Sequence, residues 1–406
     1  MLVSIKLART RPTIIGITGS FGKTTTKEAV YEVLKTSFRA YRNPKSLNTE
    51  IGLLLAVLEQ PSGFSSPVKW AKVLAGAFYN AFAGPTYDFL ILEYGADKPN
   101  DIKHLVSLVK PDIGIITHIA NVHHGDGQFK NLEDVLSEKK KLVTCLDEKG
   151  TAILNTDDAL LNKIKDEIKA KTLWFGKKGN IYADNLKNST LGFSATIHAG
   201  EQKIDASFPI AGDFHINSIL PALLCGALNG IPLEKGVEAL QNFRLPPGRM
   251  SIIEGKNNST LIDSTYNASP STMKQALELL KNFPKKKRIA VLGNMNELGE
   301  NSKSLHREVG DHVGTWVSKL ITVGTDAVLF ADGALKNGLP KARITSTMCA
   351  EDAALAISND LDEDTVVLLK GSQNNVRLER AVKILMAHPE DAKKLLCRQE
   401  TEWLRI

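Results

Sequence analysis

One short stretch near the start of the chain, residues 14–27, most constrains what this protein can fold into. It reads Ile-Ile-Gly-Ile-Thr-Gly-Ser-Phe-Gly-Lys-Thr-Thr-Thr-Lys. The apolar run Thr13–Thr18 predicts a buried strand, Gly19–Gly22 predicts a turn, and the residues from Lys23 onward predict a helix. A strand, a glycine-bearing turn, Lys-Thr and a helix in this order are typical of a cradle for nucleotide phosphates.

The residue types of this loop suit the binding of phosphate. Glycine lets backbone N–H groups turn towards phosphate oxygens, and the start of a helix adds the positive end of its dipole. Lys23 would neutralise phosphate oxygens, and the Thr24 hydroxyl would bind Mg²⁺. The loop departs from the strict G-x-x-x-x-G-K-[ST] pattern, whose first glycine would fall on Ile17. An ordinary glycine turn before a helix is the alternative.

Length and composition indicate a globular protein of two or three domains. The chain has 406 residues, of which 43% are hydrophobic and 24% charged. Its net charge of +6 suits an anionic substrate without requiring nucleic acid. The four cysteines lack C-x-x-C spacing, which predicts neither a zinc ribbon nor a disulfide framework. Met1–Arg11 does not resemble a secretory signal and no long apolar run occurs, so we expect a cytoplasmic protein without a membrane span.

Short apolar runs alternate with amphipathic stretches along most of the chain, which predicts an α/β fold in two parts. The first part is expected to be a mostly parallel sheet with a phosphate loop, and alternation within 176–209 predicts antiparallel strands. The second part is expected to be a smaller Rossmann-like α/β domain. Two prolines and a glycine at Pro246–Gly248 predict the boundary, which divides the chain into domains 1–246 and 247–406.

Three residues outside the loop are candidates for a functional role. Glu93 ends an apolar strand, and ligands gather at strand carboxyl ends in open α/β sheets. Its carboxylate would bind Mg²⁺ directly or through water, the alternative being a cap of the next element. His123 follows the next predicted strand, where a plain loop histidine is the alternative. Lys139 lies on a predicted helix beside two further lysines, a pattern that by itself indicates a solvated basic face.

The ensemble resembles the Mur ligase family, whose members use ATP to join an amino acid or peptide to a carboxylate through an acyl phosphate. The matching segments follow one another from about Thr13 to Met386. They are Thr18–Thr26, Leu47–Gly52, Leu92–Gly95, the segment of His123, the helix of Lys139, Pro247–Arg249, Asp263–Ala268, Gly293–Glu300 with His306, and Lys370–Ser372. The last three look most like members that add D-Ala-D-Ala to a UDP-sugar peptide, UDP-MurNAc-peptide, in peptidoglycan synthesis.

The resemblance implies a role for each matching residue. ATP would bind at Gly19, Ser20, Phe21, Gly22, Lys23, Thr24, Thr25, Arg249 and Asp263, with Asn217 or His215 near the base. Two Mg²⁺ ions are expected, one at Thr24 and Glu93 and one at His123, with a carbamylated Lys139 as a further metal ligand. Lys23, His123 and Lys139 are the expected catalytic residues. The expected substrate-binding residues are Asn48, Thr49, Asn267, His306, Lys370 and Ser372.

The sequence also departs from the family pattern. The phosphate loop begins within the first twenty residues, whereas typical members carry an N-terminal domain that holds the UDP-sugar. Three explanations are possible. The protein takes a different or shorter acyl acceptor, a separate subunit binds the UDP-sugar, or the UDP end of the substrate is held weakly. At Gly212–Ser218, the motif expected near the adenine is offset by one residue from the family pattern. Asn294 stands where the family has an aspartate, and Gln373 begins a stretch where an arginine is common. These changes bear on D-Ala-D-Ala specificity more than on ATP use.

Three other functions are consistent with parts of this pattern. A sibling ligase, similar to folylpolyglutamate or cyanophycin synthetases, would join another acid to another amine. A nucleotide-binding scaffold that no longer ligates would explain the altered motifs of the second domain. A phosphotransferase would use the same loop, but it needs a site for an acceptor hydroxyl that the sequence does not indicate.

Overall fold

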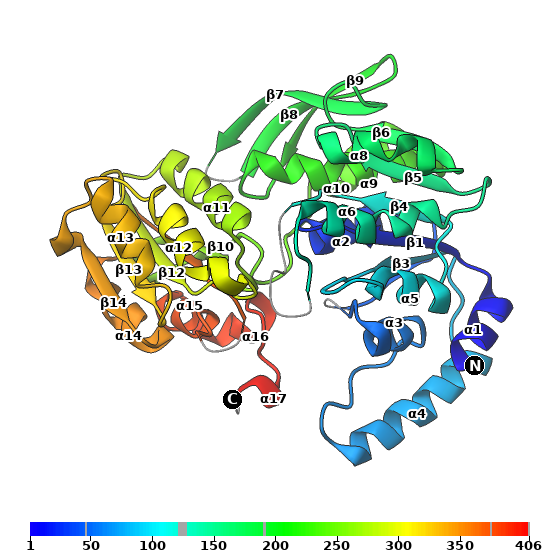
Figure 1. Ribbon diagram of the computed structural model, residues 1–406, viewed down its shortest axis with the longest axis horizontal. Coiled ribbons are helices and arrows are strands. Elements are labelled where there is room, and N and C mark those ends of the chain that lie inside the picture. Colours follow the sequence, from blue (N-terminus) through cyan, green and yellow to red (C-terminus); the bar gives the residue numbers. More distant parts are fainter. Residues whose placement is uncertain (45–46, 121–127, 190–191, 374–375, 405–406) are drawn as a thin grey trace.

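The computed structural model describes residues 1–44, 47–120, 128–189, 192–373 and 376–404. Within these ranges the chain forms two sheets, one after the other in sequence, each flanked by helices (Figure 1). The first has nine strands in the order β2-β3-β1-β4-β5-β6-β7-β8-β9, and the second has six in the order β10-β11-β15-β12-β13-β14. This arrangement confirms the predicted fold class, a mostly parallel α/β sheet followed by a smaller α/β domain.

The first sheet is parallel from β2 to β7 and ends in two antiparallel pairings, β7 with β8 and β8 with β9. The antiparallel part lies within the stretch 176–209, where alternation predicted it. The strands are β1 (Thr13–Thr18), β2 (Ala40–Arg42), β3 (Phe89–Glu93), β4 (Ile113–Ile116), β5 (Thr151–Asn155), β6 (Lys171–Phe175), β7 (Ile181–Ser189), β8 (Gly192–Ala199) and β9 (Gln202–Phe208).

Helices cover both faces of this sheet, which is why its central strands are apolar at successive positions. Ile15 belongs to the core on one face and its neighbour Ile14 to the core on the other. The helices on the first face are α2 (Lys23–Leu34), α9 (Ile216–Leu228) and α10 (Leu233–Leu240). Those on the second are α1 (Leu2–Thr10), α3 (Glu50–Val57), α4 (Pro67–Phe82), α5 (Asp101–Leu108), α6 (Leu132–Lys139), α7 (Lys141–Thr144) and α8 (Ala159–Lys163).

The second sheet is parallel apart from β10, which pairs antiparallel with β11. Its strands are β10 (Ser251–Glu254), β11 (Thr260–Ser264), β12 (Lys287–Gly293), β13 (Lys319–Val323), β14 (Ile344–Thr347) and β15 (Thr365–Lys370). One face packs against α11 (Pro270–Asn282), α12 (Ser302–Gly310) and α13 (Leu329–Lys336), and the other against α14 (Ala350–Leu355), α15 (Glu379–Leu385) and α16 (Ala392–Leu395). The predicted boundary after residue 246 falls between the two sheets.

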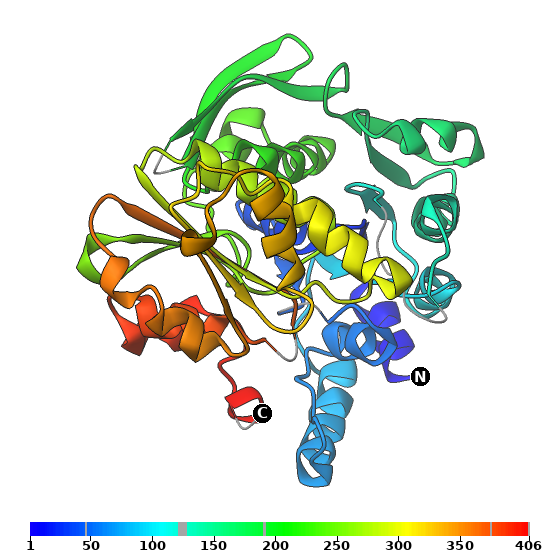
Figure 2. The same ribbon diagram turned by 60° about the vertical axis from the view of Figure 1, so that its left-hand side comes forward.

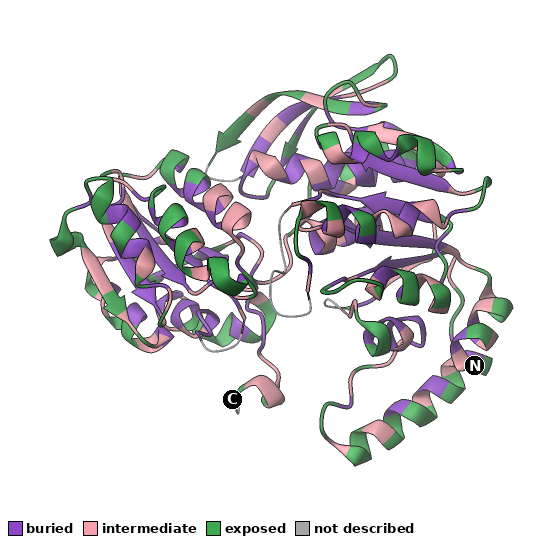
Figure 3. Ribbon diagram, viewed as in Figure 1, coloured by how far each residue is buried: buried purple, intermediate pink, exposed green. Residues whose placement is uncertain are grey.

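Buried residues concentrate in the two sheets and on the inner sides of their helices (Figure 3). The view in Figure 2 shows α4 projecting at the outer margin of the molecule, with the C-terminal helix α17 (Thr401–Leu404) nearby. In the described part of the chain, no helix combines the length and apolarity needed to cross a membrane.

Two predicted helices differ from the observed ones. The sequence pattern over Lys303–Val317 predicts a single helix, but the observed helix α12 ends at Gly310, where a β-carbon would lie 2.3 Å from the carbonyl oxygen of Phe330. Helices α12 and α13 therefore approach too closely at this point for a side chain, and the chain continues in turns. The sequence pattern over Leu132–Cys145 also predicts a single helix, whereas the structure divides this stretch into α6 and α7 around Lys140.

Candidate active site

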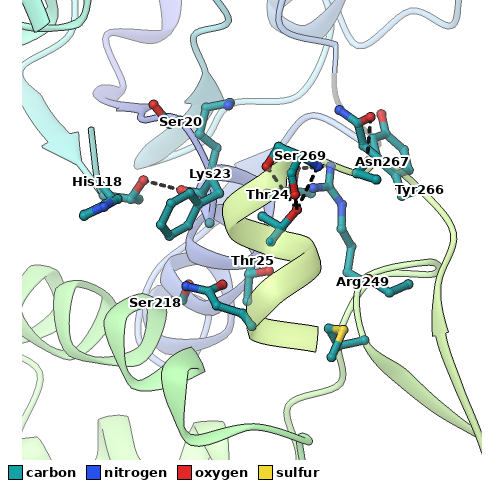
Figure 4. Close-up of a pocket in the computed structure, with 18 of the residues that line it drawn as sticks. Ser20, Lys23, Thr24, Thr25, His118, Ser218, Arg249, Tyr266, Asn267 and Ser269 are labelled. Carbon is teal, nitrogen blue, oxygen red and sulfur yellow. Dashed lines mark hydrogen bonds between the residues drawn. The ribbon is translucent and has the colours of Figure 1, made fainter. Parts of the chain in front are cut away.

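A cleft of about 550 Å³ is lined by residues of both domains. On the side of the first domain it lies at the carboxyl ends of four neighbouring strands, β3, β1, β4 and β5, which is where open α/β sheets bind ligands. Figure 4 shows side chains from the loop after β1 facing Arg249, Tyr266 and Asn267 of the second domain. Any ligand in this cleft would therefore contact both domains.

The turn between β1 and α2 depends on two glycines with positive φ. Gly19 has φ +149° and Gly22, the residue before α2, has φ +83°. A β-carbon on Gly19 would lie 2.0 Å from Oγ1 of Thr117. The turn is also tied to the segment after β4, because the Ser20 N–H donates to the His118 carbonyl at 2.7 Å and the Thr117 hydroxyl donates to the Phe21 carbonyl at 2.6 Å. These contacts hold the loop against the segment that follows β4.

Thr24 is the point where the loop, strand β3 and the second domain meet. Its hydroxyl donates to Oε2 of Glu93 at 3.0 Å and accepts from Nη2 of Arg249 at 3.1 Å. The other carboxylate oxygen of Glu93 accepts from the Asn48 amide at 3.1 Å, which orients the carboxylate. The structure thus brings together Thr24, Glu93 and Arg249 and places Asn48 beside them.

Lys23 folds back over the loop, its Nζ donating to the carbonyl of Gly19 at 2.7 Å. Burial lowers the pKa of its ammonium, the nearby Glu93 carboxylate raises it and Arg249 lowers it. The cation borders the cleft among the loop residues. The predicted loop residues Ser20, Phe21, Gly22, Lys23, Thr24 and Thr25 all line the cleft.

Arg249 reaches Thr24 across the domain junction because an aromatic ring supports it. Its guanidinium carbon lies 3.9 Å from the centre of the Tyr266 ring, and that of Arg398 lies 5.3 Å from the same ring. The buried Arg398 also donates to the carbonyls of Thr265 and Tyr266 and to Oε2 of Glu379. Glu379 in turn accepts from Arg377, so a buried ion network near the C-terminus holds the loop that carries Tyr266.

On the second-domain side, the described cleft residues include one further cation, Lys370. Its Nζ donates to the Ser264 hydroxyl at 3.0 Å and to the Asn267 carbonyl at 2.9 Å. Burial, followed by the charge of Arg249, lowers the pKa of Lys370 to about 7. The Asn267 side chain lies in the cleft, and Asn48 and Thr49 line it from the opposite domain.

Three predicted site residues lie behind the cleft wall. The Asp263 carboxylate accepts from the N–H groups of Gly248 and Thr265 and from the Thr265 hydroxyl, and burial raises its pKa to about 6. His306 accepts from the Met295 N–H and contacts the Ser302 carbonyl, so both ring nitrogens are engaged. The Ser372 hydroxyl joins the Ala268 carbonyl to the Asn296 N–H. The structure does not bring these three groups into the cleft; they hold its loops.

Lys139 is completely buried, and its Nζ has no hydrogen-bond partner among the described residues. Burial first, and then the charge of Lys23, lowers its pKa to about 7. The alternative of a solvated basic face is therefore wrong for this lysine. His123 lies outside the described residues. Within the described ranges, no group of three or more His, Cys, Asp or Glu side chains is placed to hold a metal ion.

The start of α9 lines the cleft with the residues that the sequence predicts to contact the adenine base. His215 and Asn217 both line it. Burial lowers the pKa of His215 to about 3, so the ring is neutral at physiological pH, and its Nε2 has no partner within the described part of the chain.

Sequence reasoning missed several cleft residues. Thr117 and His118 come directly after a predicted strand, and the same strand-end argument that selected Glu93 would have found them. Tyr266 was part of a matching segment but had no assigned role. Thr272, Gln275 and Asn296 come from α11 and from the loop after β12, and no local pattern signals them.

The fold and the loop geometry define a two-domain α/β protein of the phosphate-loop class. Residues 17–226 match the Mur ligase middle domain, and residues 248–373 match the glutamate ligase domain of Mur ligases. The chain belongs to the Mur ligase family.

Individual relatives share most of this chain's length. UDP-N-acetylmuramoyl-tripeptide--D-alanyl-D-alanine ligase of Bacillus subtilis is 28% identical over 380 residues, which is 93% of this chain and 76% of that protein. The structure of MurF ligase from Thermotoga maritima in complex with ADP is similar with a TM-score of 0.79 at 26% identity, covering 97% of this chain and 84% of that one. Mycobacterium tuberculosis folylpolyglutamate synthase complexed with ADP shares the fold, with a TM-score of 0.67 at 14% identity and 91% of each chain covered.

Proposed function

We propose that this protein is an ATP-dependent ligase that joins D-Ala-D-Ala to the peptide carboxylate of UDP-MurNAc-tripeptide in peptidoglycan precursor synthesis. The observation that carries the proposal is the cleft itself, in which the phosphate loop of one domain faces the Tyr266–Asn267 loop and Lys370 of the other. The Bacillus subtilis relative, named for D-alanyl-D-alanine ligation, and the similar MurF ligase of Thermotoga maritima support this choice of reaction.

The proposed reaction has two steps. The substrate carboxylate attacks the γ-phosphorus of ATP, which forms an acyl phosphate and releases ADP. The amine of the dipeptide then attacks the acyl carbon, and collapse of the tetrahedral intermediate forms the amide and expels phosphate. Because phosphoryl transfer is governed by positioning and charge, Lys23 and Arg249 would act by holding phosphate oxygens from the two sides of the cleft.

Thr24 and Glu93 would hold one Mg²⁺, since a hydroxyl and a carboxylate already meet there at 3.0 Å. A second Mg²⁺ would lie at His123. When bound, these ions would offset charge on the transferring phosphoryl group. The loop amides of Gly19–Thr24 would hold the ATP phosphates, Asn217 or His215 would contact the base, and the ribose contact of Asp263 stays a prediction.

Carbamylation of Lys139 fits the surroundings of that residue. A buried amine without a hydrogen-bond partner and with a pKa of about 7 is substantially neutral, and only the neutral amine can react with carbon dioxide. The product would be an anion able to bind metal beside Lys23. We infer from the same cleft that Asn48, Thr49, Asn267 and Lys370 contact substrate, while His306 and Ser372 act by holding the loops behind them.

How the UDP end is held is a separate part of the proposal. A shorter or different acceptor, a weakly held UDP end and a separate subunit are the three possibilities that the sequence raised. Binding of UDP-MurNAc-tripeptide to the isolated chain distinguishes them. Micromolar binding would remove the need for a second subunit, and binding that appears only when another protein is added would support one.

The experiment that tests the proposed function is release of ADP and phosphate by the purified chain with ATP, Mg²⁺, UDP-MurNAc-tripeptide and D-Ala-D-Ala. We expect turnover that requires both substrates and is lost in Lys23→Ala. Turnover only with a different acid and amine would make the protein a sibling ligase. Nucleotide binding without turnover for any pair would make it a scaffold.

A separate measurement tests the modified lysine. Intact mass in bicarbonate buffer should show one bound carbon dioxide on the wild type and none on Lys139→Ala. Short carboxylic acids should restore part of the activity of that variant by standing in for the carbamate. A wild-type chain without added mass, together with full activity of Lys139→Ala, would rule out this role.

A further inference from the structure

Helix α4 carries a continuous apolar surface that faces solvent. Its exposed apolar side chains include Val68, Leu74, Phe78, Tyr79 and Phe82, each between 51% and 69% exposed. Ala71 and Ala75 are exposed as well. At 3.6 residues per turn these seven residues fall within one arc of about 140°. We call this surface the α4 face.

The opposite side of the same helix is used for packing. Val73, Ala77 and Ala81 are buried, and the last two belong to the core over the first sheet. Arg9 of α1 donates to carbonyls of Asn80, Ala81 and Gly84 at the end of the helix, and Asn80 donates to the Leu58 carbonyl. The helix is therefore anchored by one side, and its apolar outer side is not needed for its attachment.

The position of α4 leaves the face accessible. Figures 1 and 2 both place the helix at the outer margin of the molecule, beside the N-terminus. None of the α4 residues lines the cleft. An exposed apolar surface of this extent usually marks an interaction site.

The chemistry of the α4 face favours hydrocarbon over another protein. Apart from the Tyr79 hydroxyl, its side chains offer no hydrogen-bonding group, whereas protein interfaces carry about one hydrogen bond per 100–200 Å². A bilayer interior requires no such partners. Phenylalanine and leucine on the face of a helix that lies in the membrane plane are typical of interfacial binding.

The charges around the face favour an anionic surface. Between Pro61 and Tyr87 the chain has two lysines and no acidic residue, and between Met1 and Thr13 it has three basic residues and no acidic one. Two carboxylates that contact α1 or α4 are paired with a lysine of that helix, Glu59 with Lys6 and Glu402 with Lys69. The exposed cations Lys72, Arg9 and Arg11 remain to attract anionic headgroups.

We propose that the α4 face binds the surface of an anionic lipid bilayer, with α4 lying flat and its apolar side chains inserted among the acyl chains near the headgroups. This surface is distinct from the cleft and does not depend on the proposed reaction. It would hold the enzyme at the membrane while the cleft stays open to dissolved substrates.

Vesicle flotation tests the proposal with the full chain. We expect the wild type to float with vesicles that contain phosphatidylglycerol, more weakly with pure phosphatidylcholine, and less as salt is added. Phe78→Ser combined with Phe82→Ser should lower the floated fraction at least about tenfold, because two large apolar anchors are lost. Lys72→Glu should weaken the preference for phosphatidylglycerol.

A matched control comes from the other domain. Leu355 on α14 is 67% exposed, so Leu355→Ser removes a comparable exposed apolar side chain and should float like the wild type. Nucleotide-induced thermal stabilisation should be unchanged in the double variant, which separates this test from that of the cleft. Failure of the wild type to bind vesicles, or equal binding by the double variant, would refute the proposal. A wild-type dimer in lipid-free buffer that the double substitution dissociates would instead make the face a contact between two copies.

Discussion

At the scale of single residues, the phosphate loop depends on one position, Gly19, where no side chain fits. Gly19 combines a positive φ with a β-carbon position 2.0 Å from Thr117, so both the backbone and the neighbouring side chain exclude alanine. A substitution at such a position is expected to change the conformation of the loop more than the stability of the whole protein.

Gly19→Ala should therefore abolish the thermal stabilisation that ATP and Mg²⁺ give the wild type. The control is Gly200→Ala in the turn between β8 and β9, where φ is also positive but nothing lies within 4 Å of the added carbon. That variant should lose roughly 1 kcal/mol of stability and keep the full response to ATP. An unchanged ATP response in Gly19→Ala would place the phosphates elsewhere.

Lys139 makes a second prediction at this scale, on pH. Its folded-state pKa of about 7 is below its ordinary value of 10.5, so the unfolded chain binds more protons between these pH values. The free energy of unfolding therefore rises with pH from about 7 towards 10. Below pH 7 the amine is charged in both states, and the protein is destabilised by the full cost of burying that charge.

Lys139→Met removes this titration while keeping a similar volume. In buffer free of carbon dioxide and Mg²⁺, the variant should melt above the wild type at pH 6, and the difference should shrink as pH rises to 10. A difference that does not depend on pH would mean that the amine keeps its ordinary pKa in the folded chain.

At the scale of elements, the segment after β15 supports the cleft from behind. Arg398 and Arg377 share the buried Glu379, and Arg398 also contacts the loop that carries Tyr266. These residues lie beyond the matched glutamate ligase domain, which ends at residue 373. This part of the chain thus contributes to a site that it does not line.

Arg398→Met should destabilise the protein by about 3–5 kcal/mol, because it leaves Glu379 buried with one of its two partners. It should also weaken ATP binding by releasing Tyr266 and hence Arg249. The control is Arg380→Met, whose partner Glu351 is 3.6 Å away in an exposed pair and which should cost less than about 1 kcal/mol. Chemical denaturation and nucleotide titration measure both effects, and equal costs in the two variants would contradict this account.

At the scale of the whole molecule, the hydrogen bond from Arg249 to Thr24 connects the two domains directly at the cleft. Arg249 joins the second domain to Thr24 of the phosphate loop while its guanidinium stacks on Tyr266. A nucleotide bound there would contact both domains and stabilise the folded state of each.

ATP with Mg²⁺ should therefore raise the melting temperature of the wild type, and Lys23→Ala should abolish the shift. Arg249→Lys keeps the charge but loses the planar fork and the stacking, so it should reduce the shift without removing it. Differential scanning fluorimetry over a series of ATP concentrations measures this. A full shift in Arg249→Lys would show that the second domain does not take part in nucleotide binding.

The sequence by itself determined the elements whose signals are local. The strand Thr13–Thr18, the glycine turn, the carboxylate at the end of β3 and the antiparallel stretch after residue 176 each follow from patterns within a few residues. Short-range sterics and alternation of apolar side chains decide such features, which is why they needed no three-dimensional information.

Tertiary structure alone decided which polar groups face the cleft and which form the hydrogen bonds that hold the cleft loops in place. His306, Ser372 and Asp263 match the family motifs, yet their polar atoms bond to loops of their own domain. Lys139 carries the sequence pattern of a surface lysine and is buried, whereas the apolar side of α4 is exposed. The reason is that burial and hydrogen bonding depend on neighbours far away in the sequence, which no local pattern specifies.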